Sequence, residues 1–135
     1  MSQQLIYPMA AHVVLAASLY ALLTIFRAPS IWGLGRLPDG SNPWAKLEPR
    51  VSANLSNQFE WPLFFYAACL LLIRRDELDP LAPVLAWAFV GGRILHSCVQ
   101  IFTGNVRLRG IVFTINFISV LGLWAIILRT AAMAS

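Results

Sequence analysis

The chain has 135 residues, of which 59% are hydrophobic and 12% are charged, and its formal net charge is +4. Ordinary soluble domains have roughly 45–50% apolar and 25% charged residues, and a small soluble domain leaves much of its surface in water. The composition therefore excludes an ordinary soluble domain and indicates a membrane protein. The basic residues bracket apolar segments instead of forming a stripe, which argues against nucleic-acid binding.

Four stretches, residues 5–26, 56–73, 81–103 and 110–131, have about the 20-residue length that a helix needs to cross ~30 Å of hydrocarbon. No Lys or Arg precedes the first stretch, and it exceeds the ~7–15-residue apolar core of a signal peptide, so we expect a retained membrane helix. The sequence predicts an all-α, integral membrane four-helix bundle of up-down-up-down topology. We expect a single domain over residues 1–135.

The connections differ in length and charge. The first, 27–52, is rich in Pro, Gly, Asn and Trp and is expected to form an ordered loop at the membrane interface, with Trp32 and Trp44 as headgroup anchors. The first and third connections share a face and carry Arg27, Arg36, Lys46, Arg50, Arg107 and Arg109, whereas the opposite face has Arg74, Arg75 and Arg129. Since cytoplasmic loops carry the basic excess, we predict cytoplasmic basic loops and two non-cytoplasmic termini.

Two ionisable residues fall inside the expected spans, Glu60 in the second and Arg93 in the third. Such residues usually face a bundle interior and pair with a partner. Glu60 lies 17 residues before Glu77, near the middle of the turn between the two spans, and Arg93 lies 16 residues after it. The two therefore lie at nearly equal depth, and we expect an ion pair between them. One alternative is that the pair only fixes helix register.

Further polar residues extend from this pair toward the predicted cytoplasmic face. Asn57 lies three residues before Glu60, and His96 and Gln100 follow Arg93 by three and seven residues. Taken singly, Asn57 could help helices pack, His96 could be a hydrogen-bonded interior histidine, and Gln100 could be an interfacial residue. Basic residues near the ends of the spans add to the group: Arg27, Arg50, Arg107 and Arg109. Together these residues predict a cationic cleft that suits a small anion carrying carboxylates.

Other kinds of site are not expected. His12 and His96 lie in different spans, and no Cys/His pair has the spacing of metal ligands. Cys69 and Cys98 lie at depths about 18 Å apart, which argues against a disulfide between them. The pair Gly91-Gly92 lies in the middle of a span, where it favours close helix packing.

The run from Glu48 to Pro62, followed by Gly92-Arg93-Ile94-Leu95-His96, resembles the MAPEG superfamily, the membrane-associated proteins in eicosanoid and glutathione metabolism. The resemblance covers nearly the whole chain and is closest to the microsomal prostaglandin E synthase and microsomal glutathione transferase branch. It implies a homotrimer of four-helix subunits. It also implies that glutathione, as co-substrate, binds between neighbouring subunits near the cytoplasmic face.

The resemblance also implies roles for individual residues. Those that match glutathione-site or supporting positions are Arg27, Arg50, Asn57, Glu60, Arg93, His96 and Gln100. Either Arg107 or Arg109 matches the arginine that stabilises the glutathione thiolate. A guanidinium beside the sulfur favours the charged form, lowers the thiol pKa and so activates the nucleophile.

The chain departs from the family pattern at four positions. Gln100 and Phe113 stand where active members have tyrosines, and Ala53 stands where a polar or basic residue is expected. Gly110 stands where the prostaglandin synthase branch has a serine beside its arginine, which argues against prostaglandin chemistry.

The leading hypothesis is a trimeric membrane glutathione transferase or peroxidase that acts on hydrophobic electrophiles arriving through the lipid. The missing tyrosines favour a rival, a non-enzymatic lipid-binding scaffold like the lipoxygenase-activating members of the superfamily. A third hypothesis is a small transporter, in which the polar residues would line a path.

Overall fold

The chain is all-α, as the sequence predicts, in a computed structural model that describes residues 2–134. A short 3-10 turn, η1 (Ser2–Leu5), precedes five α-helices: α1 (Ile6–Trp32), α2 (Glu48–Asn57), α3 (Pro62–Ile73), α4 (Leu81–Phe102) and α5 (Val106–Ala134). The first and last residues of the predicted domain lie outside the described residues.

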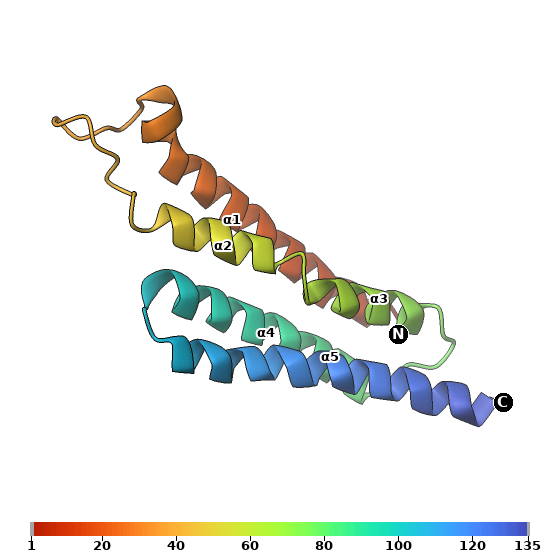
Figure 1. Cartoon of the computed structure of the whole chain (residues 1–135). Helices are drawn as coiled ribbons and strands as arrows, with labels where there is room; N and C mark the ends of the chain where they lie inside the picture. The colour runs from red at the N-terminus through yellow and green to blue at the C-terminus, as the bar shows by residue number, and fades with distance from the viewer. Residues whose placement is uncertain (1, 135) are drawn as a thin grey trace.

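Across the described residues the helices make four passes of up-down-up-down topology (Figure 1). Helix α1 runs in one direction, α2 and α3 together run back, α4 returns and α5 runs back again. The α1–α2 loop and the α4–α5 connection lie at one end of the bundle, and both termini lie at the other (Figure 1). The predicted basic loops therefore share one end. The side of a membrane that this end faces stays a prediction.

The first predicted helix is too short. Helix α1 continues past residue 26 to Trp32, with Pro29 inside it, and ends at Gly33, whose φ of 72° is the left-handed conformation typical of a helix C-terminus. The charged Arg27 does not end the helix, since its side chain is partly exposed and pairs with Glu48. The ordered loop is correspondingly shorter than the predicted 27–52.

The last predicted helix is also too short. Helix α5 begins at Val106, before the predicted residue 110, and continues past residue 131 to Ala134. The Asn105 side chain explains the early start, because its Oδ1 accepts the backbone N–H of Leu108 at 3.0 Å and so caps the first turn.

The second pass was predicted as one helix over 56–73, and this prediction is wrong. Pro62 has no N–H, and inside a helix its ring clashes with the carbonyl four residues earlier, that of Gln58. The chain therefore leaves α-helical geometry just before Pro62, where tighter bonds such as Phe59 N–H to Ser56 C=O, at 3.1 Å, take over. Residues in this break do not continue the faces of α2.

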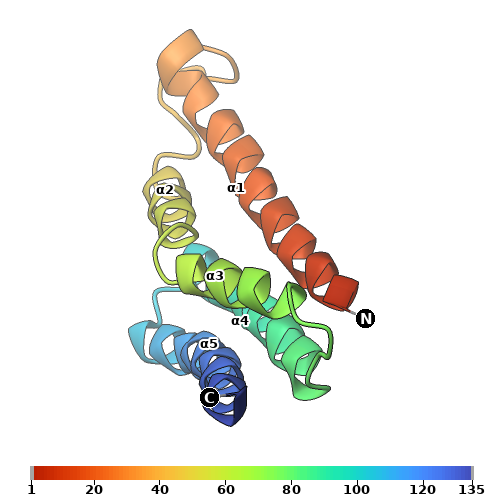
Figure 2. The same cartoon turned by 90° about the vertical axis from the view of Figure 1, so that its right-hand side faces the viewer.

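The main apolar core lies toward the end that carries the termini. Its residues come from η1, α3, α4 and α5: Leu5, Phe65, Ala68, Cys69, Leu72, Ala82, Ala86, Phe89, Val90, Val120, Leu123, Ile126 and Ile127. Phe65 stacks on Phe89 with ring centroids 4.1 Å apart. We call this cluster the terminal-end core. Seen from the side, α3 and α4 lie between α1 and α5 (Figure 2).

A smaller apolar cluster joins α1, α2 and α4 toward the opposite end. It consists of Leu19, Leu23, Phe26, Val51, Leu55 and Ile101. Trp44, in the α1–α2 loop, stacks on Phe26 with ring centroids 4.7 Å apart, which fixes the loop against α1. We call this cluster the loop-end core.

Helices α4 and α5 pack tightly at Gly92. A Cβ atom on Gly92 would lie 2.4 Å from Asn116 Oδ1, whereas one on Gly91 would meet nothing within 4 Å. The predicted close packing at the glycine pair therefore belongs to Gly92 alone.

Three helical segments are long and apolar enough to span a membrane: Gln3–Trp32, Leu81–Phe102 and Val106–Ala134. The second pass differs, since α2 has 10 residues and α3 has 12. Large apolar side chains cover the outer surface of the bundle, as expected where lipid replaces water.

Candidate functional site

The centre of the site is Arg93 on α4, a fully buried side chain that is 1% exposed. Its Nε donates to Oε1 of Gln58 at 3.1 Å. Its Nη2 is buried and has no hydrogen-bond partner among the described residues. A buried donor without a partner is costly and marks a place where a ligand or water belongs.

The predicted ion pair between Glu60 and Arg93 is wrong. The ion pairs within residues 2–134 join Arg27 to Glu48 and Arg129 to Asp79. The prediction counted depth along a continuous helix, but Glu60 lies in the break before Pro62, where its side chain is exposed.

Glu60 and Arg93 nevertheless line the same small cavity, which we call the inner cavity. It has a volume of about 120 Å³ and is also lined by Asn57, His96 and Phe113. His96 is 4% exposed, and its Nδ1 has no partner in the part of the chain that the structure describes. The inner cavity thus brings together most of the polar residues predicted on the second and third spans.

A second hollow, the outer cleft, lies between α2, the end of α4 and the start of α5. It has a volume of about 280 Å³ and is lined by Arg50, Ala53, Gln100 and Arg109, among others. Arg109 is partly buried here, whereas Arg107 is exposed and lines none of the cavities described in this section. Of the two arginines that the sequence left open, Arg109 is the one in the cleft.

Gln100 links polar residues that were predicted on the second and third spans. Its Oε1 accepts from Nδ2 of Asn54 at 2.9 Å and from Nδ2 of Asn57 at 3.2 Å. Arg50 is fixed in the same region, since its Nη1 donates to the carbonyl of Ile101 at 3.3 Å. The outer cleft is therefore backed by a network of side-chain amides.

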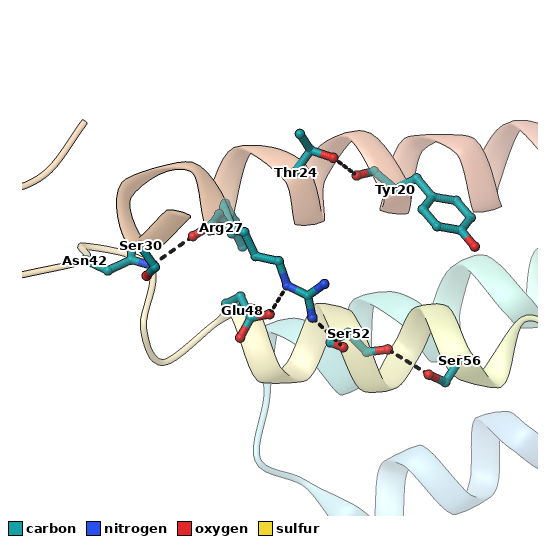
Figure 3. Close-up of polar contacts among 9 residues, drawn as sticks. Tyr20, Thr24, Arg27, Ser30, Asn42, Glu48, Ser52 and Ser56 are labelled. Atoms are coloured by element: carbon teal, nitrogen blue, oxygen red, sulfur yellow. Dashed lines mark hydrogen bonds and ion pairs between the residues drawn. The ribbon is translucent and has the colours of Figure 1, made fainter. Parts of the chain in front are cut away.

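Arg27 lies apart from this group. Its Nε donates to Glu48 Oε1 at 2.6 Å and its Nη2 to Ser52 Oγ at 3.2 Å, so it joins α1 to α2 (Figure 3). It lines a separate cavity of about 360 Å³, together with Ser30 and Glu48 among others. The structure does not bring Arg27 together with the other predicted site residues.

Sequence reasoning missed Gln58 and His12. Gln58 and His12 are each 2% exposed, and His12 Nε2 lies 2.9 Å from Gln58 Oε1. The Tyr66 hydroxyl lies 2.7 Å from His12 Nδ1. The rule that selected Glu60 and Arg93, that polar groups at membrane depth have partners, would also have selected His12.

A further hollow is apolar. It has a volume of about 450 Å³ and lies between α1 and the second pass, with Val13, Ala16, Tyr20 and Leu63 among its lining residues. Lipid chains would cover such a surface in a bilayer, so its apolar volume alone does not define a ligand.

The fold and the site together define a polytopic α-helical membrane protein with a cationic cleft above a buried polar network. The chain belongs to the MAPEG family, whose model matches residues 5–129. It is therefore an integral membrane protein of the group that acts in membrane glutathione or eicosanoid metabolism. The chain significantly matches no curated protein and no solved structure.

Proposed function

We propose that this chain is a glutathione-dependent membrane transferase or peroxidase that acts on hydrophobic electrophiles. The observation that carries the proposal is the outer cleft, where Arg50 of α2 and Arg109 of α5 face one hollow. The inner cavity adds two buried polar atoms without partners, Arg93 Nη2 and His96 Nδ1.

The residues present fit the chemistry of glutathione, which carries two carboxylates, an ammonium group and a thiol. Guanidinium groups bind carboxylates with paired hydrogen bonds, which suits Arg50 and Arg93. Glu60, exposed at the inner cavity, offers a carboxylate for the ammonium group. These charges of both signs support glutathione over a simple anion.

Arg109 is the residue that we assign to the thiol. A guanidinium beside the sulfur favours the thiolate, which is the nucleophile, and the thiol proton passes to solvent. In the transferase reaction a sulfur–carbon bond forms at the electrophile, and the leaving group departs with its bonding electron pair. Hydrophobic electrophiles would arrive through the surrounding lipid.

Turnover of a chlorinated aromatic electrophile tests the assignment, with purified protein in detergent and with Arg109→Ala compared to Arg107→Ala. The two variants remove the same side chain two positions apart, one from the cleft and one from an exposed position. We expect Arg109→Ala to lower kcat about 100-fold, the size of effect seen when one charge-stabilising donor is lost, and Arg107→Ala to have a much smaller effect. Equal turnover in both variants and the native chain would show that neither arginine acts on sulfur.

A second candidate function is a non-enzymatic lipid-binding scaffold. The observation that favours it is the state of Gln100, whose side-chain oxygen is taken up by two asparagine amides at a position where active members have a tyrosine. Calorimetry with millimolar glutathione separates the two functions. Absence of both a binding heat and a thermal shift would favour the scaffold and refute the transferase.

We further propose that the protein is a homotrimer, as the family resemblance implies. The outer cleft and the inner cavity are small for a tripeptide, since ligand sites usually measure ~300–1,000 Å³, and a neighbouring subunit would complete them. Light scattering on the purified detergent complex measures the subunit number. A monomeric protein that still binds glutathione would contradict a shared site.

A further inference from the structure

The Gln58 side chain uses its whole hydrogen-bonding capacity inside the bundle. Its Oε1 accepts from Arg93 Nε at 3.1 Å and from His12 Nε2 at 2.9 Å. Its Nε2 donates to Asn54 Oδ1 at 3.1 Å and to Ser97 Oγ at 3.3 Å. Gln58 thus joins α1, α2 and α4 at a position that is 2% exposed.

These partners allow only one orientation of the Gln58 amide. If the amide turned over, its NH₂ group would face the N–H groups of Arg93 and His12, and its oxygen would lose both bonds. In a buried site, donors that face each other without an acceptor cost the desolvation free energy of each group. The amide therefore presents its oxygen to Arg93.

His12 and Tyr66 add a second fixed point. Because Gln58 Oε1 can only accept, the ring proton of His12 lies on Nε2, the atom that faces Gln58. His12 Nδ1 then accepts from the Tyr66 hydroxyl at 2.7 Å, and the same hydroxyl lies 3.4 Å from the Met9 carbonyl. The His12 ring is held between aromatic neighbours, with ring centroids 5.5 Å from Tyr66 and 5.6 Å from Phe89. A hydrogen-bonded chain thus runs from Tyr66 through His12 and Gln58 to Arg93.

We propose that Tyr66, His12 and Gln58 are positioning residues, which hold the Arg93 guanidinium by its Nε and leave Nη2 to bind an anion in the inner cavity. The catalytic consequence rests on the proposed function, but the holding of Arg93 does not. An arginine side chain loses rotamer freedom when it binds a ligand, so fixing it beforehand raises affinity. Tyr66, His12 and Gln58 would act through Arg93 and would not touch the ligand themselves.

The first test measures Arg93 directly, without glutathione. In protein labelled with ¹⁵N-arginine, the Arg93 Nε–H resonance is assigned by its loss in Arg93→Lys, and its exchange with water is timed. We expect the Arg93 Nε–H proton to exchange about tenfold faster in Tyr66→Phe, which removes one hydroxyl from the hydrogen-bonded chain. Exchange should be faster still in His12→Leu. His12→Gln, whose amide can donate to Gln58, is expected to restore slow exchange.

Tyr20→Phe is the matched control. Tyr20 lines the same apolar hollow as Tyr66, but its hydroxyl makes no hydrogen bond within the described residues. We expect native exchange in this variant. The proposal would be overturned if Tyr66→Phe also shows native exchange and the melting temperature of His12→Leu equals that of the native chain. If His12→Leu does not fold, the comparison of the two tyrosine variants decides.

The second test separates this proposal from the proposed function. Calorimetric Kd values for glutathione are expected to rise about tenfold in Tyr66→Phe and to stay native in Tyr20→Phe. If the native chain binds no glutathione but Arg93 exchange still responds to Tyr66→Phe, the positioning role stands and the transferase proposal fails. If glutathione binds and neither exchange nor Kd responds, the positioning role fails alone.

Discussion

The two ends of the bundle are held together by different kinds of contact. The terminal-end core consists of apolar side chains, with Phe65 and Phe89 stacked at its centre. The opposite half has a smaller apolar cluster. The hydrogen-bonded network starts beside the terminal-end core, where His12 lies 5.6 Å from Phe89, and runs through Gln58 to Arg93. In the first half a lost group leaves a void, whereas in the second it leaves a partner without a hydrogen bond. We therefore expect one half to determine stability and the other to determine ligand binding.

The break before Pro62 is the boundary between these halves. Helix α3 is composed almost wholly of apolar residues, whereas α2 carries Arg50, Asn54 and Asn57. The second pass therefore contributes α3 to one half and α2 to the other. The break before the proline allows the two helices to present different faces to their neighbours.

The largest effect is expected from Phe65→Ala, which empties the middle of the terminal-end core. Phe65 is 0% exposed, and truncation of a buried Phe costs about 3–5 kcal/mol of unfolding free energy. Phe102→Ala is the control, because Phe102 is 70% exposed. Denaturation in detergent measures both. A loss in Phe65→Ala no larger than in the control would break the comparison.

A smaller effect is expected from Gly92→Ala, where the added Cβ would meet Asn116 Oδ1 at 2.4 Å. Forcing α4 and α5 apart should lower the unfolding free energy by about 1–3 kcal/mol. Gly91→Ala makes the same change one residue away with nothing within 4 Å, so it should leave stability near native. Equal melting temperatures for the two variants would contradict the close approach described for Gly92.

Arg93→Met sharpens the comparison because it should abolish glutathione binding without lowering stability. Arg93 donates to the neutral Gln58 and shares a cavity with Glu60, but the two charges form no ion pair within residues 2–134. Replacing this buried guanidinium with an apolar side chain of similar length should therefore keep the unfolding free energy or raise it by about 1 kcal/mol. Glutathione binding should be lost. Parallel denaturation and calorimetry measure the two quantities, and a variant that is destabilised yet still binds would reverse the assignment of the two halves.

The smallest effect is expected outside both halves, in the α1–α2 loop. The Ser41 hydroxyl, followed by the Ser41 backbone N–H, holds the pKa of Asp39 below its ordinary value. Because the pKa is lowered by folding, the charged Asp39 contributes stability above its unfolded pKa, and this is lost as pH falls through the folded pKa. Ser41→Ala should raise the Asp39 pKa in an NMR titration while the melting temperature at neutral pH stays native. An unchanged titration would show that the hydroxyl has no part in it.

The sequence predicts the all-α fold and the four passes because long apolar runs have few alternatives at membrane depth. The helix bounds were wrong where local chemistry overrides hydropathy. Pro62 was visible in the sequence, but the prediction followed the apolar length of the second pass and not the local clash of a proline with the carbonyl four residues before it. Arg27 was taken as a helix end because it is charged, but its side chain is partly exposed and pairs with Glu48 on another helix while α1 continues.

The site was predictable as far as helix periodicity reaches. Spacings of three and four residues correctly grouped His96 with Arg93, and both face the inner cavity. Gln58 was missed because a residue next to Asn57 falls on another face of an unbroken helix, and its partner His12 comes from a different pass. Such pairings depend on how separate helices pack, and the spacing of residues along one helix does not predict this.

The broken second pass also bears on how the protein is made. Neither α2 nor α3 is long enough to cross ~30 Å of hydrocarbon alone, and α2 brings a guanidinium and several amides with it. Those amides have their partner on a neighbouring pass, since Asn54 and Asn57 both donate to Gln100 of α4. This segment should therefore be a poor substrate for insertion by itself, and we expect it to enter the bilayer only together with the neighbouring helices.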